Sequence, residues 1–128
     1  MSTGKERAKP RIGPEGERIA REYLERSLGW RVHAVNWRCR FGELDLVASE
    51  GDWVVVVEVK TRASERFGTA EEAVDAHKRR HLRRLIECLL LTQPELRGRP
   101  VRLDVIGIYM RDGVVHRLRH VRDALDGW

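Results

Sequence analysis

Two acidic residues and a lysine stand within two consecutive apolar segments of the chain. Asp45 lies in the segment 43–49, and Glu58 and Lys60 close the segment 53–61. Four valines precede Glu58, and such a run, apolar on both faces, is typical of a strand buried inside a sheet. Residues two apart on a strand point to the same side, so Glu58 and Lys60 share a face. Ionised groups leaving a buried strand are costly unless they are paired or hold a metal.

A turn at residues 49–52 predicts that these two segments form an antiparallel hairpin. Counting outward from Gly51 pairs Asp45 with Val57 or Glu58, which makes the two carboxylates neighbours. Two carboxylate oxygens, a backbone carbonyl and water are the ligands that Mg²⁺ prefers. Lys60 would then orient or deprotonate a water, or stabilise charge on a phosphate. This interpretation is metal-assisted phosphodiester hydrolysis.

An ordinary structural interpretation stands beside it. Glu58 and Lys60 could form an ion pair at a strand end, while Asp45 pairs with an arginine. The pattern alone leaves both interpretations open.

The remaining elements follow from periodicity and from glycine and proline positions. We expect a flexible basic tail over 1–13 and one domain over 14–128. Within the domain we expect helices at 14–28 and 70–92, strands at 30–37, 43–49, 53–61, 101–110 and 114–119, and a short final helix at 121–125. The order αβββαββ predicts an α/β fold with a mixed central sheet of about five strands flanked by helices.

Composition narrows the class of partner. Lys and Arg number 25 against 20 Asp and Glu, a net charge of +5 that favours a polyanion such as nucleic acid. The basic N-terminus shows no signal-peptide pattern, and no apolar run is long enough to cross a bilayer. With two cysteines outside any metal-binding spacing, we expect a cytoplasmic protein that has no membrane association.

The segments 42–48 and 57–62 read Gly-Glu-Leu-Asp-Leu-Val-Ala and Val-Glu-Val-Lys-Thr-Arg. Together they resemble the core of the PD-(D/E)xK nuclease superfamily. The pattern is most similar to the YraN-like family of predicted bacterial endonucleases, and more distantly to archaeal Holliday-junction resolvases. The resemblance covers about residues 13–119 and implies a restriction-endonuclease-like core.

The resemblance also implies roles for particular residues. Asp45 and Glu58 would bind Mg²⁺ or Mn²⁺, the Val59 carbonyl would be a further ligand, and Lys60 would be the catalytic lysine. The superfamily's proline before the first acid is replaced by Leu44. Glu17 matches an acidic position that can complete the metal site in resolvase-like members. A first-turn acid that suits the helix dipole is the alternative reading of Glu17.

Four basic residues are candidate nucleic-acid contacts: Arg40, Arg62, Lys78 and Arg79. Lys78 lies on the apolar face of its helix, and either reaches toward the site or extends to solvent. The expected function is that of an endonuclease acting on structured DNA in repair or recombination. Resolving a DNA junction would need two active sites, and a homodimer would supply them. A non-catalytic nucleic-acid-binding module and an adaptor on the same fold are the alternatives.

Other polar and aromatic residues have structural interpretations. We expect Asp104 in a structural ion pair, and His77 and His81 on a solvated helix face. Cys39 and Cys88 are expected to behave as small apolar residues. Of Trp30, Trp37 and Trp53, at least two are expected in the core.

Overall fold

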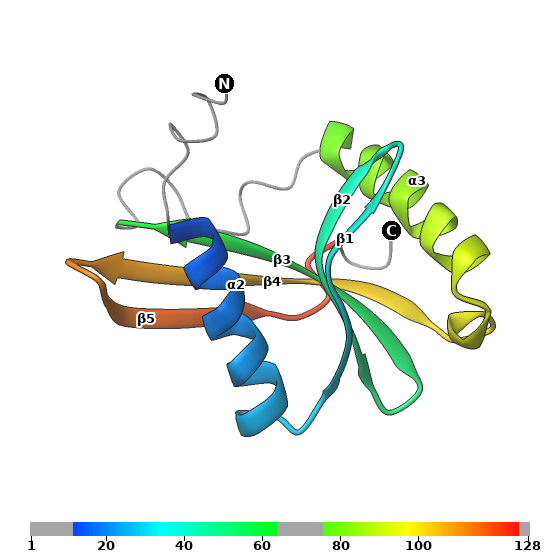
Figure 1. Ribbon diagram of the computed structural model, residues 1–128. Coiled ribbons are helices and arrows are strands. Elements are labelled where there is room, and N and C mark those ends of the chain that lie inside the picture. Colours follow the sequence, from blue (N-terminus) through cyan, green and yellow to red (C-terminus); the bar gives the residue numbers. More distant parts are fainter. Residues whose placement is uncertain (1–11, 64–75, 126–128) are drawn as a thin grey trace.

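The computed structural model describes residues 12–63 and 76–125. Within them a five-stranded mixed sheet lies between two helices (Figure 1). The elements are α2 (Ile12–Glu22), a π-helical turn η1 (Tyr23–Ser27), β1 (Arg31–Cys39), β2 (Gly42–Glu50), β3 (Trp53–Arg62), α3 (Ala76–Thr92), a 3₁₀ turn η3 (Pro94–Leu96), β4 (Val101–Arg111) and β5 (Val114–Val121). The expected α/β class and the order αβββαββ are confirmed in these residues.

The strands follow one another across the sheet in the order β1-β2-β3-β4-β5. Only β3 and β4 are parallel, and the segment that contains α3 connects them. The other neighbouring strands pair antiparallel. The predicted β2–β3 hairpin is therefore confirmed, and β3 is the central strand.

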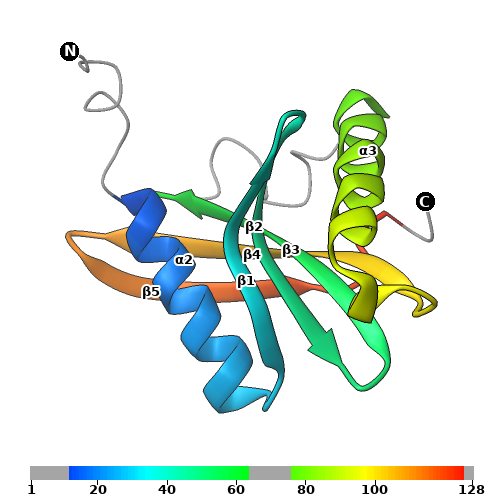
Figure 2. The ribbon, with the colours of Figure 1, turned by 45° about the vertical axis from the view of Figure 1, so that its right-hand side comes forward.

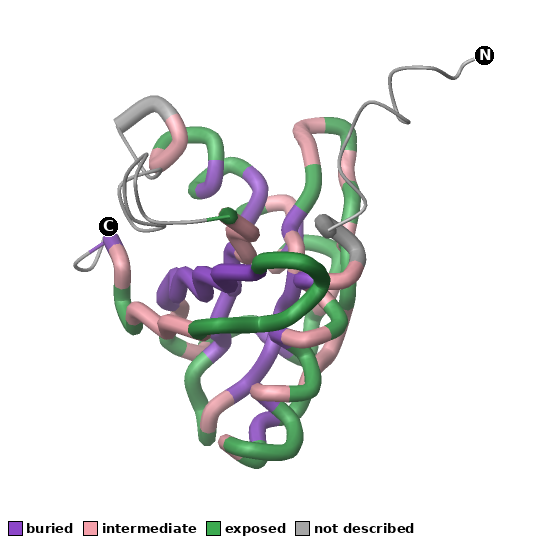
Figure 3. Tube along the Cα trace, turned by 90° about the vertical axis from the view of Figure 1, so that its left-hand side faces the viewer, coloured by how far each residue is buried: buried purple, intermediate pink, exposed green. Residues whose placement is uncertain are grey.

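Each face of the sheet carries its own apolar cluster, one under each helix (Figure 2). Val55 and Val57 belong to the cluster beneath α2, whereas Val54 and Val56 belong to the cluster beneath α3. All four valines are fully buried, as the apolar run of β3 predicted. Buried residues accordingly gather in the middle of the sheet (Figure 3).

Several expected boundaries differ from those observed. The chain after β5 bends and turns over residues 122–125, so the predicted final helix at 121–125 is wrong. Val121 itself pairs with Val105 as the end of β5. The turn that follows is held by Asp104, which accepts the Asp123 amide, and by the hydrogen bond from the Ala124 amide to the Leu103 carbonyl. The first helix begins at Ile12. Residues 1–11 of the predicted tail and 70–75 of the predicted second helix lie outside the described residues.

Among the described helices, none has the length and apolar character needed to cross a membrane.

Candidate active site

The site forms where β2 separates from β3 while it remains paired with β1. β2 pairs with β3 only from Glu50↔Trp53 to Leu46↔Val57, whereas β3 continues beside β4 as far as Arg62. Beyond the last pair, a backbone amide of β3 bonds to the Asp45 carboxylate and not to a backbone carbonyl of β2. Its Oδ2 accepts the Val59 amide at 2.8 Å. Asp45 lies one residue beyond the last pair, as Glu58 does on β3, so the two residues are neighbours although the backbone ladder does not pair them.

Glu58 and Lys60 lie on the face of β3 that carries α3. Glu58 Oε1 is 3.9 Å from Lys60 Nζ, at the outer limit of an ion pair. The Glu58 side chain is only 8 % exposed and that of Lys60 21 %. Part of the ordinary interpretation is thus correct, because Glu58 and Lys60 do pair. For Asp45 the structure gives a hydrogen bond from the Val59 backbone amide, and the arginine partner stays a prediction.

Burial shifts the pKa of all three groups, and the neighbouring charges modify these shifts. Burial, and then the charge of Asp45, raises the pKa of Glu58 to about 7. Burial also raises the pKa of Asp45, although the Val59 amide and Lys60 oppose that rise. The pKa of Lys60 is lowered, first by burial and then by the neighbouring Lys78. The site therefore holds two facing carboxylates that Lys60 neutralises only in part.

Glu17 approaches the same place from α2. It is the sixth residue of that helix, past the first turn, so the helix-dipole interpretation does not apply to it. Burial and the charge of Asp45 raise its pKa, while a hydrogen bond from Asn36 lowers it. The close approach of α2 depends on Gly16, because a Cβ at that position would overlap the Thr61 hydroxyl.

Asn36 was not singled out by the sequence analysis. It occupies the left-handed region with φ 54°, where asparagine is tolerated better than most residues. It lies in β1 between Val35 and Trp37, whose partners Leu46 and Leu44 flank Asp45. Nothing in the local sequence marks this residue, because its role depends on α2 packing nearby.

The predicted basic residues lie at three places around the acids. Lys78 reaches the site from α3, since its charge lowers the pKa of both Asp45 and Glu58. Arg62 ends β3 on the face of Glu58 and Lys60. Arg79 follows Lys78, and within the described part of the chain its buried Nε has no hydrogen-bond partner.

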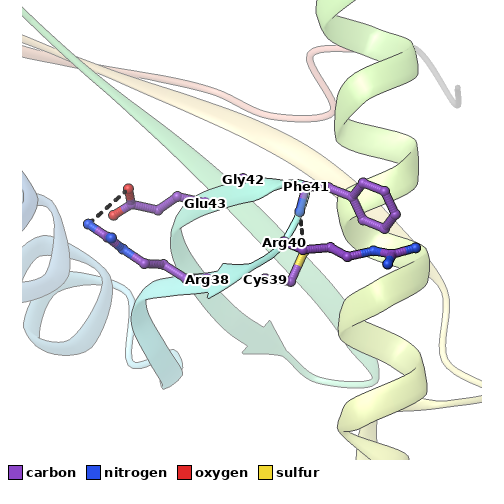
Figure 4. A pocket seen from close by; sticks show the side chains of 6 residues that line it. All are labelled: Arg38, Cys39, Arg40, Phe41, Gly42 and Glu43. Atoms are coloured by element: carbon purple, nitrogen blue, oxygen red, sulfur yellow. Dashed lines mark hydrogen bonds and ion pairs between the residues drawn. The ribbon is translucent and has the colours of Figure 1, made fainter.

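Arg40 belongs to a cavity of about 300 Å³ at the turn between β1 and β2. Figure 4 shows Arg40 and Phe41 pointing toward α3, with Arg38 and Glu43 on the opposite side. The Arg40 guanidinium carbon lies 4.9 Å from the centre of the Phe41 ring. Glu43, which also contributes to the raised pKa of Asp45, pairs with Arg38 at 3.7 Å. The cavity therefore borders the acidic site and presents guanidinium groups beside it.

Asp45 and Glu58 are hard oxygen donors of the kind that Mg²⁺ and Mn²⁺ prefer. The pKa of each is raised, chiefly by burial, and that of Glu58 is raised further by the charge of Asp45, so a bound cation would stabilise their ionised forms. In the ranges 12–63 and 76–125, no group of three or more His, Cys, Asp or Glu side chains is arranged to hold a metal. A bound ion would thus take further ligands from water, a backbone carbonyl such as that of Val59, or a phosphate, as Mg²⁺ commonly does.

A second polar cluster lies away from this site, on the face of the sheet that carries α2. It consists of Tyr23, Arg102, Asp104 and His120. Asp104 has no exposed surface and binds Arg102 Nε at 2.9 Å, which confirms the predicted ion pair. His120 Nε2 contacts the same carboxylate at 2.8 Å, and its Nδ1 lies 2.9 Å from the Tyr23 hydroxyl. Although burial alone would raise the pKa of Asp104, bonds from His120 and Arg102 hold it below its usual range.

The burial of the tryptophans and the exposure of His81 agree with the sequence predictions. Trp30 is buried and Trp37 packs partly buried against the α3-side cluster, whereas Trp53 is 41 % exposed. His81 is exposed on α3, and the side chain of His77 lies outside the described residues.

Residues 16–108 match the sequence model of the uncharacterised protein family UPF0102, a span that contains all of the site residues just described. The chain belongs to the UPF0102 family. A UPF0102 protein of Mycolicibacterium vanbaalenii is 44 % identical over 120 residues, which are 94 % of this chain and 97 % of the relative. One from Beutenbergia cavernae is 45 % identical over 116 residues, with 91 % and 97 % covered. One from Desulforamulus reducens is 37 % identical over 116 residues, with 89 % and 94 % covered. UPF0102 names a family and no reaction, so the activity has to be argued from the site.

Proposed function

We propose that this UPF0102 protein is a metal-dependent endonuclease of the PD-(D/E)xK type that hydrolyses phosphodiester bonds in nucleic acid. Structured DNA, as met in repair or recombination, is the expected substrate class. The observation that carries the proposal is the departure of β2 from β3 after Leu46↔Val57. That departure places Asp45, Glu58 and Lys60 together at the end of a buried strand, which is the arrangement that metal-assisted phosphoryl chemistry needs.

Each residue has a distinct task in this proposal. Asp45 and Glu58 would hold the cation, whose chemistry is to polarise the phosphate and activate water. The Val59 amide fixes the Asp45 carboxylate, so that one carboxylate oxygen stays available. Lys60 would orient the attacking water and balance charge that develops on the phosphate. The water oxygen bonds to phosphorus, one ester P–O bond breaks, and the departing oxygen takes up a proton.

The surrounding cations suit a phosphate backbone. Arg40 lies in the cavity beside the acids, and Arg62 follows Lys60 on the same face of β3. Such contacts position the nucleic acid without reading its sequence.

A cleavage assay tests the proposal. Purified protein is incubated with labelled single-stranded, duplex, flap and four-way-junction DNA in Mg²⁺, in Mn²⁺ and in chelator. We expect metal-dependent cleavage that falls by roughly 100-fold or more in Asp45→Asn and in Glu58→Gln proteins. Asp52→Asn, in the exposed β2–β3 turn, is the matched control and should cleave normally.

A negative result would also be informative. The nuclease proposal fails if cleavage persists in chelator or survives both substitutions. DNA binding without cleavage or metal dependence would instead favour the binding module. In that case Arg40→Ala should weaken binding, whereas Arg26→Ala, an exposed arginine in η1, should not. Absence of affinity for any DNA or RNA at low salt would favour the adaptor.

A further inference from the structure

The turn of the β1–β2 hairpin lies against one face of α3. A Cβ placed on Gly42 would come within 2.9 Å of His81 Nε2 and 3.6 Å of Leu85 Cδ2. Beside it, the Phe41 ring centre is 5.4 Å from the Arg84 guanidinium carbon. Positions 81, 84, 85 and 88 share one face of a helix because they are three or four residues apart. The next side chain along this face is Cys88.

Cys39 is the hairpin residue that meets Cys88. It ends β1, pairs with Gly42 across the turn, and packs against the apolar cluster beneath α3. A hydrogen bond between the two thiols, together with burial, raises the pKa of Cys88. Both cysteines are free and partly buried. The two thiols, from elements far apart in the chain, therefore lie near each other where β1 contacts α3.

We propose that Cys39 and Cys88 form a reversible intramolecular disulfide when the protein meets a peroxide. Cys39 reacts first, because it lines the cavity of about 300 Å³ and Cys88 does not. Its sulfur bonds to one peroxide oxygen as the O–O bond breaks and one water leaves. The Cys88 sulfur then attacks the Cys39 sulfur, the S–O bond breaks, and a second water leaves. Two thiols and one hydrogen peroxide thus give one disulfide and two waters.

The disulfide would fasten the hairpin turn to α3. In the reduced protein Cys39 packs against the apolar cluster beneath α3, in agreement with the sequence interpretation of that residue. Disulfides in reducing compartments are usually transient and redox-sensing, which suits a pair of thiols next to an open cavity. The inference does not depend on nuclease activity, because it rests only on the contact between β1 and α3.

Mass spectrometry tests the pair directly. The folded protein is treated with hydrogen peroxide, the excess is removed, and remaining thiols are alkylated. We expect a mass loss of about 2 Da, no alkylated thiol, and a peptide joining Cys39 to Cys88, all reversed by dithiothreitol. Cys39→Ser and Cys88→Ser proteins are the controls and should each retain one thiol or oxidise it singly. Alkylation of both cysteines after peroxide, or oxygen addition without cross-linking, would overturn the proposal.

Thermal unfolding supplies a second, independent readout. A cross-link between distant positions restricts the unfolded chain, so the oxidised protein should unfold about 10 °C above the reduced protein. Neither single variant should show this rise. A lower Tm after oxidation would contradict the proposal, because the bond would then form only from a distorted arrangement.

Discussion

At the scale of single residues, the site consists of two largely buried carboxylates, Asp45 and Glu58, and the ammonium group of Lys60 beside them. The charge of Asp45 raises the pKa of Glu58 beyond what burial alone does, and that of Glu43 does the same for Asp45. Lys60 opposes both shifts, and its Nζ lies 3.9 Å from Glu58 Oε1. Lys78 adds a second ammonium group on the α3 side. Because the two lysines come from different elements, they are expected to serve different tasks.

Substitution of the two lysines by methionine should separate these tasks. Lys60→Met should lower kcat by roughly 100-fold with little change in KM, since Lys60 lies beside Glu58 and would act on the reacting phosphate. Lys78→Met should mainly raise KM, and should reduce the salt dependence of DNA binding by about one unit of slope. Steady-state kinetics and binding across salt concentrations measure both effects. Equal losses of kcat in the two variants would contradict this division.

Asp104 makes a prediction about stability and pH. Because its folded pKa lies below its usual range, it stabilises the protein above the unfolded pKa of about 3.9, and this stability is lost as pH falls through the folded value. Asp104→Asn should cost about 1–3 kcal/mol near neutral pH, because the buried Arg102, which keeps Glu50, and His120 both lose a charged hydrogen-bond partner.

Urea unfolding between pH 3 and pH 8 checks this prediction. The difference between Asp104→Asn and the parent protein should shrink below about pH 4. Asp52→Asn is the control and should stay within about 0.5 kcal/mol of the parent throughout. A pH-independent difference would mean that Asp104 does not act through its charge.

At the scale of elements, the contact between α2 and β3 decides whether Glu17 reaches the acids. Gly16 lies directly over Thr61, one residue past Lys60 in β3. An alanine in a helix ordinarily gains up to about 1 kcal/mol over glycine. Here the added methyl group would meet the Thr61 hydroxyl, so the sign of the effect should reverse.

We therefore expect Gly16→Ala to destabilise the protein by about 1–3 kcal/mol and to reduce cleavage. Thr61→Ala removes the opposing hydroxyl, so the double variant should recover most of the lost stability. A double-mutant cycle by chemical denaturation measures this coupling. Additive effects of the two substitutions would show that α2 does not pack as closely as the structure indicates.

At the scale of the whole molecule, stability is concentrated in the centre of the sheet. β3 is paired on both sides along Val54–Val57, and β4 lies between β3 and β5. β1 and β5 are the edge strands, and β5 is exposed over much of its length. The site lies where β3 is still paired with β4 but is no longer paired with β2.

Hydrogen exchange should follow this gradient. Amides of β3 and β4 are expected to exchange slowest, and those of β5 near Val114 fastest, because local opening costs least where burial is low. The Val59 amide tests the site itself, since it is protected by the Asp45 carboxylate. Asp45→Ala should accelerate exchange at Val59 while Val55 stays slow. Equal acceleration at both amides would indicate global destabilisation instead.

The sequence by itself determined the elements and the three central residues. The valine run before Glu58 requires a buried strand, and the turn at Gly51 sets the register that pairs Leu46 with Val57 and so brings Asp45 near Glu58. These are local properties, because alternation and turn type depend on neighbours in the chain. The end of the chain shows the limit of such reasoning. Val121 joins β5 because it pairs with Val105, a contact that residues 121–125 alone do not reveal.

Only the tertiary structure decided what surrounds the three residues. Glu17 meets Asn36 because Gly16 lets α2 lie close to β3. Cys39 meets Cys88 because the hairpin turn packs on α3. Each contact joins segments far apart in the chain, and its partner is selected by packing geometry rather than by spacing along the sequence.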